Sequence, residues 1–372
     1  MFQKVLALIF AFFASIFGFF QPIRVTQNTA PVATTTFQAT TTISIATTTP
    51  QTKIKQIAKK IVKNKLPVSR PLPTVQTPSA ITQTPPQPVP PPDFGTINAS
   101  ARPAIVNIFC TANGDTLDPI SGTGVIIDPQ GIILTNAHVA EYLLLKNYRE
   151  PNFIQCVVRT GSPAINTYNA DLLYISPQWV RDNVGVITSQ NPTGTGENDF
   201  AFLRITSTVS GAPISSVPYI PPHIAENITV NEPVVLISYP AGFLGGISIA
   251  EDLSASSAVT TIQDVFTFGQ STIDVISVGG TIVSQKGSSG GAVIDGNSTL
   301  IGLISTSDEN PTTAERTLHA ITLPYISRTL ESDLGQTLPQ FLSGDLPGFE
   351  TNFLTNTAPG LTKLLTDQLN QQ

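Results

Sequence analysis

Short apolar runs separated by Gly, Pro, Asn and Asp dominate the chain from Ala101 onwards. Such runs are typical of short β-strands, and few helical patterns separate them. The one short helical candidate among them is 138–146. These features favour an all-β sandwich or barrel fold, in two units between residues 101 and 330. We expect strands at 104–110, 122–128, 132–136, 153–159, 168–175 and 200–205 in the first unit, and at 233–238, 257–266, 272–278, 281–284, 292–295, 299–305 and 317–323 in the second.

The N-terminus has the pattern of a membrane signal. Lys4 precedes sixteen uncharged residues, Val5 to Phe20, which are rich in Phe, Ile and Leu. This run is long for the apolar core of a signal peptide, but it is slightly shorter than the ~18 residues expected of a membrane-spanning helix. Because no A-x-A cleavage site follows, we expect residues 1–21 to be an uncleaved signal-anchor, with a cleaved signal peptide as the alternative. The rest of the chain would then be extracytoplasmic and membrane-anchored, or secreted after cleavage.

Residues 22–96 are of low complexity, first Thr-rich and then Pro-rich. Such a composition buries too little apolar surface to offset chain entropy, so we interpret this segment as a disordered tether. Within it, 53–65 places lysines opposite Ile and Val at helical spacing, which fits either a basic helix on a membrane surface or a solvated spacer. At the other end, we expect 331–372 to be a peripheral tail with a helix near 361–371.

Charge divides the chain in two. Residues 1–92 hold nine Lys/Arg and no Asp or Glu, whereas the remainder holds ten Lys/Arg and twenty-five Asp/Glu. An acidic domain is poorly suited to neutralising nucleic-acid phosphates, so we expect no nucleic-acid partner. With two cysteines and no zinc-type Cys/His spacing, we also expect no metal, no cofactor and no disulfide-dense scaffold.

The stretch "QKGSSGGAVI" (285–294) sets two serines before a glycine pair. It can be a tight turn between strands, or a nucleophile on a turn whose N–H groups face an oxyanion. The second interpretation needs a base. Of the three histidines, His223 lies in a Pro-flanked loop and His319 in an apolar run. His138 ends the apolar strand "GIILTNAHV", and strand ends often carry functional residues.

Five motifs, in order, resemble those of trypsin-like serine proteases, most closely the HtrA-like bacterial branch. The resemblance covers about 230 residues, 101–330. The motifs are similar to the His-bearing strand pair, the Asp segment, the first strand of the second barrel, the nucleophile loop and the strand that lines the substrate cleft. In this sequence they read "SGTGVIIDPQGIILTNAHV" (121–139), "NDFAFLRI" (198–205), "VVLISYPAG" (234–242), "KGSSGGAVI" (286–294) and "LIGLIST" (300–306).

The resemblance implies two six-stranded antiparallel β-barrels in a domain spanning 97–330, with the active site in the cleft between them. Barrel 1 would span about 101–206 and barrel 2 about 218–330. The resemblance also implies that the protein is a serine endopeptidase, which hydrolyses protein or peptide substrates through an acyl-enzyme. The implied residues are a triad of His138, Asp199 and Ser289, an oxyanion hole formed by Gly287 and Ser289, and a hydrogen bond from Ser305 to Asp199.

The same resemblance places the floor of the primary specificity pocket at Val283. Its walls would be Ile304, Ser305 and Thr306. An Arg or Lys side chain would lack a charge partner there, so we expect cleavage after small or medium aliphatic residues.

A disulfide between Cys110 and Cys156 is expected as well, since the first and fourth strands are neighbours in the resembled topology. The alternative is two buried free thiols.

The sequence departs from the HtrA-like pattern in one respect, and two other interpretations compete with that of a serine protease. HtrA-like proteins usually carry PDZ domains after the protease, and about 42 residues follow position 330, too few for one. The first rival is a catalytically inert, surface-tethered binding module on the same fold. The second is an α/β-hydrolase esterase, because "GSSGG" also fits G-x-S-x-G and Asp308 and His319 follow in that order. It requires a strand–turn–helix context around Ser289, where the sequence favours a hairpin.

Overall fold

The computed structural model describes residues 91–114, 117–189, 194–242, 244–269, 271–307 and 316–371. The expected signal-anchor (1–21), the basic segment (53–65) and nearly all of the expected tether therefore lie outside the described residues. Within these ranges, no helix combines the length and the apolar character that crossing a membrane requires.

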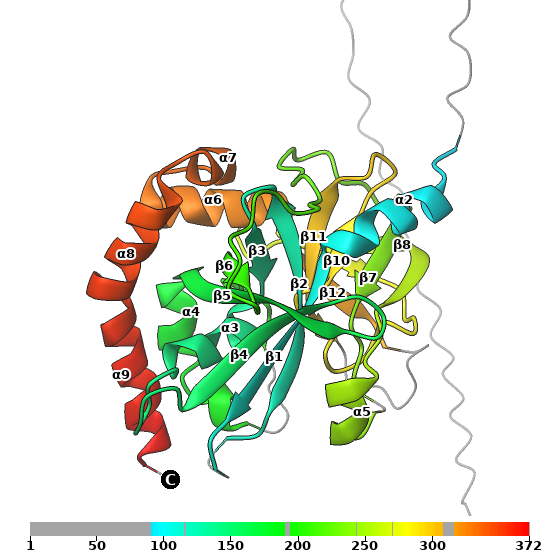
Figure 1. Cartoon of the computed structure of the whole chain (residues 1–372). Coiled ribbons are helices and arrows are strands. Elements are labelled where there is room, and N and C mark those ends of the chain that lie inside the picture. The colour runs from blue at the N-terminus through cyan, green and yellow to red at the C-terminus, as the bar shows by residue number, and fades with distance from the viewer. Residues whose placement is uncertain are drawn as a thin grey trace, which may run out of the picture. The chain divides into compact units, whose positions relative to one another are not determined.

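Six antiparallel strands close the first barrel in the order β1-β2-β3-β6-β5-β4 (Figure 1). Aliphatic residues of these strands, such as Ile105, Ile133 and Leu173, are fully buried. The strands are β1 (Ile105–Ala112), β2 (Ile120–Asp128), β3 (Ile132–Thr135), β4 (Ile154–Thr160), β5 (Ile165–Ile175) and β6 (Ala201–Thr208).

The second barrel repeats this plan, with the order β10-β11-β12-β9-β8-β7 and antiparallel pairing throughout. Its interior holds Val234, Ile276 and Val293. The strands are β7 (Pro233–Ser238), β8 (Ser256–Phe266), β9 (Val275–Val278), β10 (Ala292–Ile294), β11 (Leu300–Ser307) and β12 (Leu318–Thr322).

Two closed six-stranded antiparallel barrels confirm the fold expected from the sequence and exclude the α/β-hydrolase interpretation, which needs a helix after the nucleophile turn. Strand β10 follows Ser289 instead. One expected strand, 281–284, is wrong. The N–H of Ser284 donates to the main-chain oxygen of Thr281, and this tight turn directs Val283 into the core.

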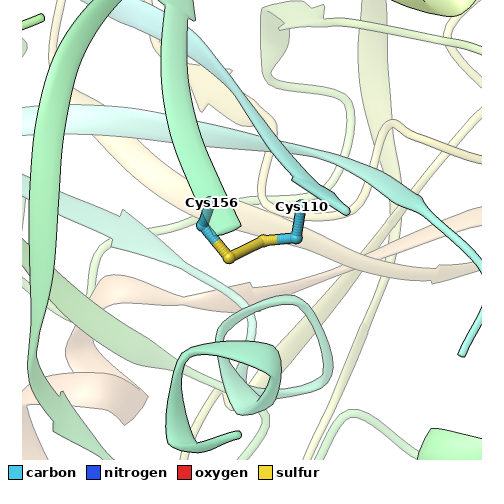
Figure 2. The surroundings of a disulfide bond; sticks show 2 residues. All are labelled: Cys110 and Cys156. Carbon is cyan, nitrogen blue, oxygen red and sulfur yellow. A yellow bond between two sulfur atoms is a disulfide. The ribbon is translucent and has the colours of Figure 1, made fainter. Parts of the chain in front are cut away.

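Cys110 in β1 and Cys156 in β4 lie directly opposite each other and are joined by a disulfide (Figure 2). The bond ties together two neighbouring strands of barrel 1 whose cysteines are separated by 46 positions in the sequence.

Short helices connect and flank the strands. α2 begins one residue after Asp93, whose side chain accepts hydrogen bonds from the N–H groups of Gly95 and Thr96. This cap starts the folded part before the expected boundary at residue 97. The helices before the C-terminal region are α2 (Phe94–Ala101), η1 (Arg102–Ala104), α3 (Ala137–Leu144), α4 (Pro177–Asp182), η2 (Val186–Thr188) and α5 (Gly246–Glu251).

Four consecutive helices form the C-terminal region, which corrects the expectation of a peripheral tail with a single helix. Each has Pro in its first turn, a position where the missing N–H costs nothing. They curve along barrel 1, where α8 contacts β5 and α9 contacts α3 and α4 (Figure 1). The helices are α6 (Leu323–Leu334), α7 (Leu338–Leu342), α8 (Leu346–Asn356) and α9 (Ala358–Leu369).

Candidate active site

Three element ends bring the predicted catalytic residues to the junction of the barrels. His138 is the second residue of α3, directly after β3. Asp199 lies two residues before β6, and Ser289 lies three residues before β10. His138 and Asp199 therefore come from barrel 1 and Ser289 from barrel 2.

Asp199 and His138 are hydrogen-bonded through both side chain and main chain. Nδ1 of His138 lies 2.8 Å from Oδ2 of Asp199, and the His138 main-chain N–H donates to Oδ1 at 3.1 Å. The hydroxyl of Ser305 donates to Oδ2 at 2.7 Å. Asp199 is buried, while 23% of the His138 side chain is exposed. The carboxylate is thus enclosed and the imidazole reaches the surface.

This arrangement sets the pKa values of both groups. Burial by itself raises the pKa of Asp199, but His138 and the hydrogen bonds from His138 and Ser305 outweigh it and lower that pKa. Burial lowers the pKa of His138, whereas the charge of Asp199 and the shared hydrogen bond raise it above its ordinary value. Asp199 is therefore ionised at neutral pH, and Nδ1 of His138 donates its proton to it. Nε2 is left as the basic nitrogen.

Asn136, which the sequence analysis did not single out, also holds Asp199. Its side-chain amide, fully buried, donates to the main-chain oxygen of Asp199 at 2.8 Å. Asn136 is also the residue that precedes α3. An Asn two residues before a candidate histidine was visible in the sequence, but nothing in the spacing alone distinguished it from an ordinary helix cap.

The hydroxyl of Ser289 lies beside Ser305, the residue whose hydroxyl binds Asp199. In the described part of the chain it donates to the main-chain oxygen of Ser305 at 3.5 Å, rather than to the imidazole of His138. Hydrogen bonds between catalytic groups are often long before a substrate binds. Ser289 itself is half-buried.

The turn that carries Ser289 depends on two glycines with positive φ. Gly287 has φ 92° and Gly290 has φ 84°. A Cβ on Gly290 would lie 1.9 Å from the main-chain oxygen of Thr123, so no side chain fits there. Ser288 between them is buried and its hydroxyl accepts a hydrogen bond from that of Ser238 at 2.9 Å. These contacts hold the turn against both barrels.

Two N–H groups on this turn have no acceptor among the described residues: those of Gly287 and Ser289. The neighbouring N–H groups are used within the protein, because Ser288 donates to Gln285 and Gly290 donates to Ile304. Two free main-chain donors beside a serine hydroxyl can bind an oxyanion that forms at the serine.

Residues 122–303 match the family model described as the trypsin-like peptidase domain. The matched region runs from β2 to β11 and contains His138, Asp199 and Ser289 in the expected order. A comparison with curated proteins found no match. The match thus includes strands of both barrels, and the four C-terminal helices lie beyond the matched residues.

The other histidines lie apart from the hydrogen bonds described above. His223 pairs through Nε2 with the side chain of Asn227 at 2.7 Å. His319 lies in β12 opposite Thr306, with its ring 5.8 Å from that of Phe266. Asp308, which the rival hydrolase interpretation needs, lies outside the described residues.

The residues predicted to line the specificity pocket divide into two groups. Val283 and Ile304 are fully buried in the aliphatic core of barrel 2. The side chain of Ser305 is directed to Asp199 instead. Thr306 is half-buried and pairs with His319. The expected floor is thus aliphatic.

Proposed function

We propose that the protein is a serine endopeptidase in which Ser289 is the nucleophile, His138 the general base and Asp199 the group that orients His138. The observation that carries this proposal is the buried carboxylate of Asp199 bonded to Nδ1 of His138, next to a serine whose turn offers two free N–H groups. The match to the trypsin-like peptidase domain supports the same reaction class. The motif "TNAHV" and the nucleophile loop further favour a place near the HtrA-like branch.

In the proposed reaction, Nε2 of His138 accepts the Ser289 proton while Oγ attacks the carbonyl carbon of the substrate. The N–H groups of Gly287 and Ser289 donate to the oxyanion that forms. The His138 imidazolium then gives its proton to the leaving amine, which releases the first product and leaves an acyl-enzyme. Water, deprotonated by His138, hydrolyses the ester and restores Ser289. Asp199 stays ionised and stabilises the imidazolium throughout.

The substrates are peptides or proteins cleaved after small or medium aliphatic residues. The resemblance places Val283 and Ile304 at the primary specificity pocket, and because both are aliphatic, a charged side chain beside them would lack a partner. Because one methylene changes discrimination by only ~1–3 kcal/mol, the preference should be broad over Val, Ala and Leu. A cleavage profile against a peptide library tests this, and dominant cleavage after Arg or Lys would contradict it.

Substitution of the three residues tests the catalytic assignment. Ser289→Ala, His138→Ala and Asp199→Asn should each remove most peptide hydrolysis and leave the circular dichroism spectrum unchanged, because a triad acts as a unit. His223→Ala and His319→Ala are the matched controls and should retain activity. Full activity of the Ser289→Ala protein would overturn the proposal.

A surface-tethered binding module without activity is the second candidate. It keeps the barrels but would not need both a buried Asp–His pair and free N–H groups at the serine.

For either function, we propose that the N-terminal segment attaches the domain to a membrane on its extracytoplasmic side, or is cleaved to release it. Resistance of the domain to protease added outside intact cells, lost only on lysis, would contradict this location.

A further inference from the structure

Thr123 in β2 of barrel 1 is buried and binds three residues of barrel 2. Its N–H donates to the main-chain oxygen of Ser289 at 2.8 Å. Its hydroxyl donates to the main-chain oxygen of Gly287 at 2.7 Å and accepts from the N–H of Tyr239 at 3.0 Å. Its own main-chain oxygen accepts from the hydroxyl of Thr135 at 2.7 Å. Every polar atom of Thr123 is therefore hydrogen-bonded.

Each main-chain carbonyl oxygen of the nucleophile turn, residues 286–289, accepts a hydrogen bond from within the protein. The oxygen of Lys286 accepts from the N–H of Ala241 at 2.7 Å, and that of Ser288 accepts from the N–H of Gly291 at 2.9 Å. The remaining two, on Gly287 and Ser289, are held by Thr123. Of these four donors, only the hydroxyl of Thr123 belongs to a side chain.

A peptide unit is planar, so fixing its oxygen also fixes the N–H of the next residue. The bond from Ala241 therefore orients the N–H of Gly287, and the bond from Gly291 orients that of Ser289. The peptide unit between these two donors is the one whose oxygen Thr123 holds. Gly287 would tolerate other backbone conformations, since glycine has no Cβ to restrict it. Loss of the hydroxyl would leave the Gly287 oxygen without its donor, and this peptide unit would be held only by the bond from the Ser288 N–H to the main-chain oxygen of Gln285 at 3.1 Å.

We propose that Thr123 is a positioning residue for the oxyanion hole: its hydroxyl, reaching from the first barrel, holds the peptide unit that links the Gly287 and Ser289 donors and so keeps their two N–H groups in register. This inference rests on the proposed serine-protease function. Thr123 acts through the turn and does not touch the substrate.

The test compares two pairs of variants in the full-length protein. Thr123→Val removes the hydroxyl and keeps the shape, whereas Thr123→Ser keeps the hydroxyl and loses a methyl group. Thr123→Ala completes the set, because Ala and Ser differ by the hydroxyl alone, and the Ser/Ala pair decides the matter if the Val variant does not fold. Thr135→Val is the matched control: it removes a buried hydroxyl that bonds to Thr123 but to no carbonyl of the turn.

Two readouts separate positioning from stability. For an aliphatic peptide substrate, Thr123→Val and Thr123→Ala should lower kcat by about 10- to 100-fold, somewhat less than loss of a whole oxyanion donor, with little change in KM. Affinity for a peptide boronic acid, which forms a tetrahedral adduct on Ser289, should fall by a similar factor. Thr123→Ser and Thr135→Val should stay within about threefold of the wild type in both measurements.

Three results would overturn the inference: wild-type kcat in both hydroxyl-free variants, an equal loss in Thr123→Ser, or a loss of kcat with unchanged boronic-acid affinity. A wild-type protein that neither hydrolyses peptides nor binds the boronic acid would instead refute the proposed function, and this inference with it.

Discussion

Asp199 carries a negative charge in a buried position, and its surroundings compensate for that cost. Both of its carboxylate oxygens accept hydrogen bonds from His138, and Ser305 donates a third. A buried carboxylate without such partners would be protonated and could not orient an imidazole. The same contacts stabilise the protonated form of His138, which determines the pH range of activity.

The activity should decline on the acid side at a pH above 6.5. Asp199 raises the pKa of His138 above its ordinary value of 6.5, so the base is protonated and inactive at a higher pH than a free histidine. A pH profile of kcat/KM measures this, because it reports the pKa of the free enzyme's base. Ser305→Ala, which removes one hydrogen bond to Asp199, should retain an acid limb but lower the activity. An acid limb centred below pH 6.5 in the wild type would contradict the account.

Glu141, one turn after His138 in α3, is a second buried carboxyl group. It is 1% exposed, and its Oε2 has no hydrogen-bond partner among the described residues. Burial, and then the charge of Asp199, raise the pKa of Glu141 well above its ordinary value. The folded protein therefore keeps Glu141 protonated at pH values where the unfolded chain ionises it.

Glu141→Gln should stabilise the protein at neutral and alkaline pH. A group with a raised pKa contributes full stability below its unfolded pKa, and that contribution is lost as pH rises through the folded pKa. In the wild type, the free energy of unfolding should fall by up to about 1.4 kcal/mol per pH unit above pH 5, and Gln should remove this fall. Urea unfolding at several pH values measures it. Glu251→Gln, on an exposed residue, should change nothing, and equal pH slopes for Glu141→Gln and the wild type would contradict the account.

At the scale of elements, the C-terminal helices are an integral part of the fold. Arg204 of β6 pairs with the buried Glu350 of α8, and the hydroxyl of Tyr174 in β5 donates to Asp333 of α6 at 2.8 Å. The Tyr325 hydroxyl of α6 accepts from the N–H of Asn198, the residue before Asp199, at 3.0 Å. These helices thus brace β5, β6 and the segment that carries Asp199.

Phe353→Ala should test that role. Phe353 in α8 is 4% exposed, with its ring 5.5 Å from that of Tyr174. Its removal leaves a cavity and should lower the free energy of unfolding by about 3–5 kcal/mol in urea titrations. The adjacent Leu354 is 41% exposed, so Leu354→Ala should change stability by less than about 0.5 kcal/mol. Equal effects of the two substitutions would show that the helices do not pack as described.

Most strands can be predicted from the sequence because short apolar runs and Gly or Asn turns specify strands locally, whereas the closure into two barrels is expected only from the family resemblance. In the C-terminal region we predict from the sequence one helix near 361–371, without using the Pro residues of "LPQ", "LPG" and "APG", which lie in the first turns of three helices. The run 281–284 was misread because an apolar stretch resembles a strand even when a turn buries it. The contacts of Thr123 and Asn136 join residues far apart in the sequence, and no spacing rule anticipates them.

At the scale of the whole molecule, the site exists only where the barrels meet. Barrel 1 supplies His138 and Asp199, and barrel 2 supplies Ser289 and Ser305. Thr123 connects the two through the nucleophile turn, with bonds to Gly287 and Ser289. A nucleophile on barrel 2 that is activated by a base on barrel 1 should react with a probe at one serine alone.

That reaction is the most direct test of the account. The full-length protein would be treated with a fluorophosphonate probe, digested and mapped by tandem mass spectrometry, which separates Ser288 from Ser289. We predict a single adduct on Ser289, because the neighbouring Ser288 is buried and bonded to Ser238. The adduct should be lost in His138→Ala, which lacks the base. No adduct, an adduct on another serine, or undiminished labelling of His138→Ala would contradict the assignment of Ser289 as a nucleophile activated by His138.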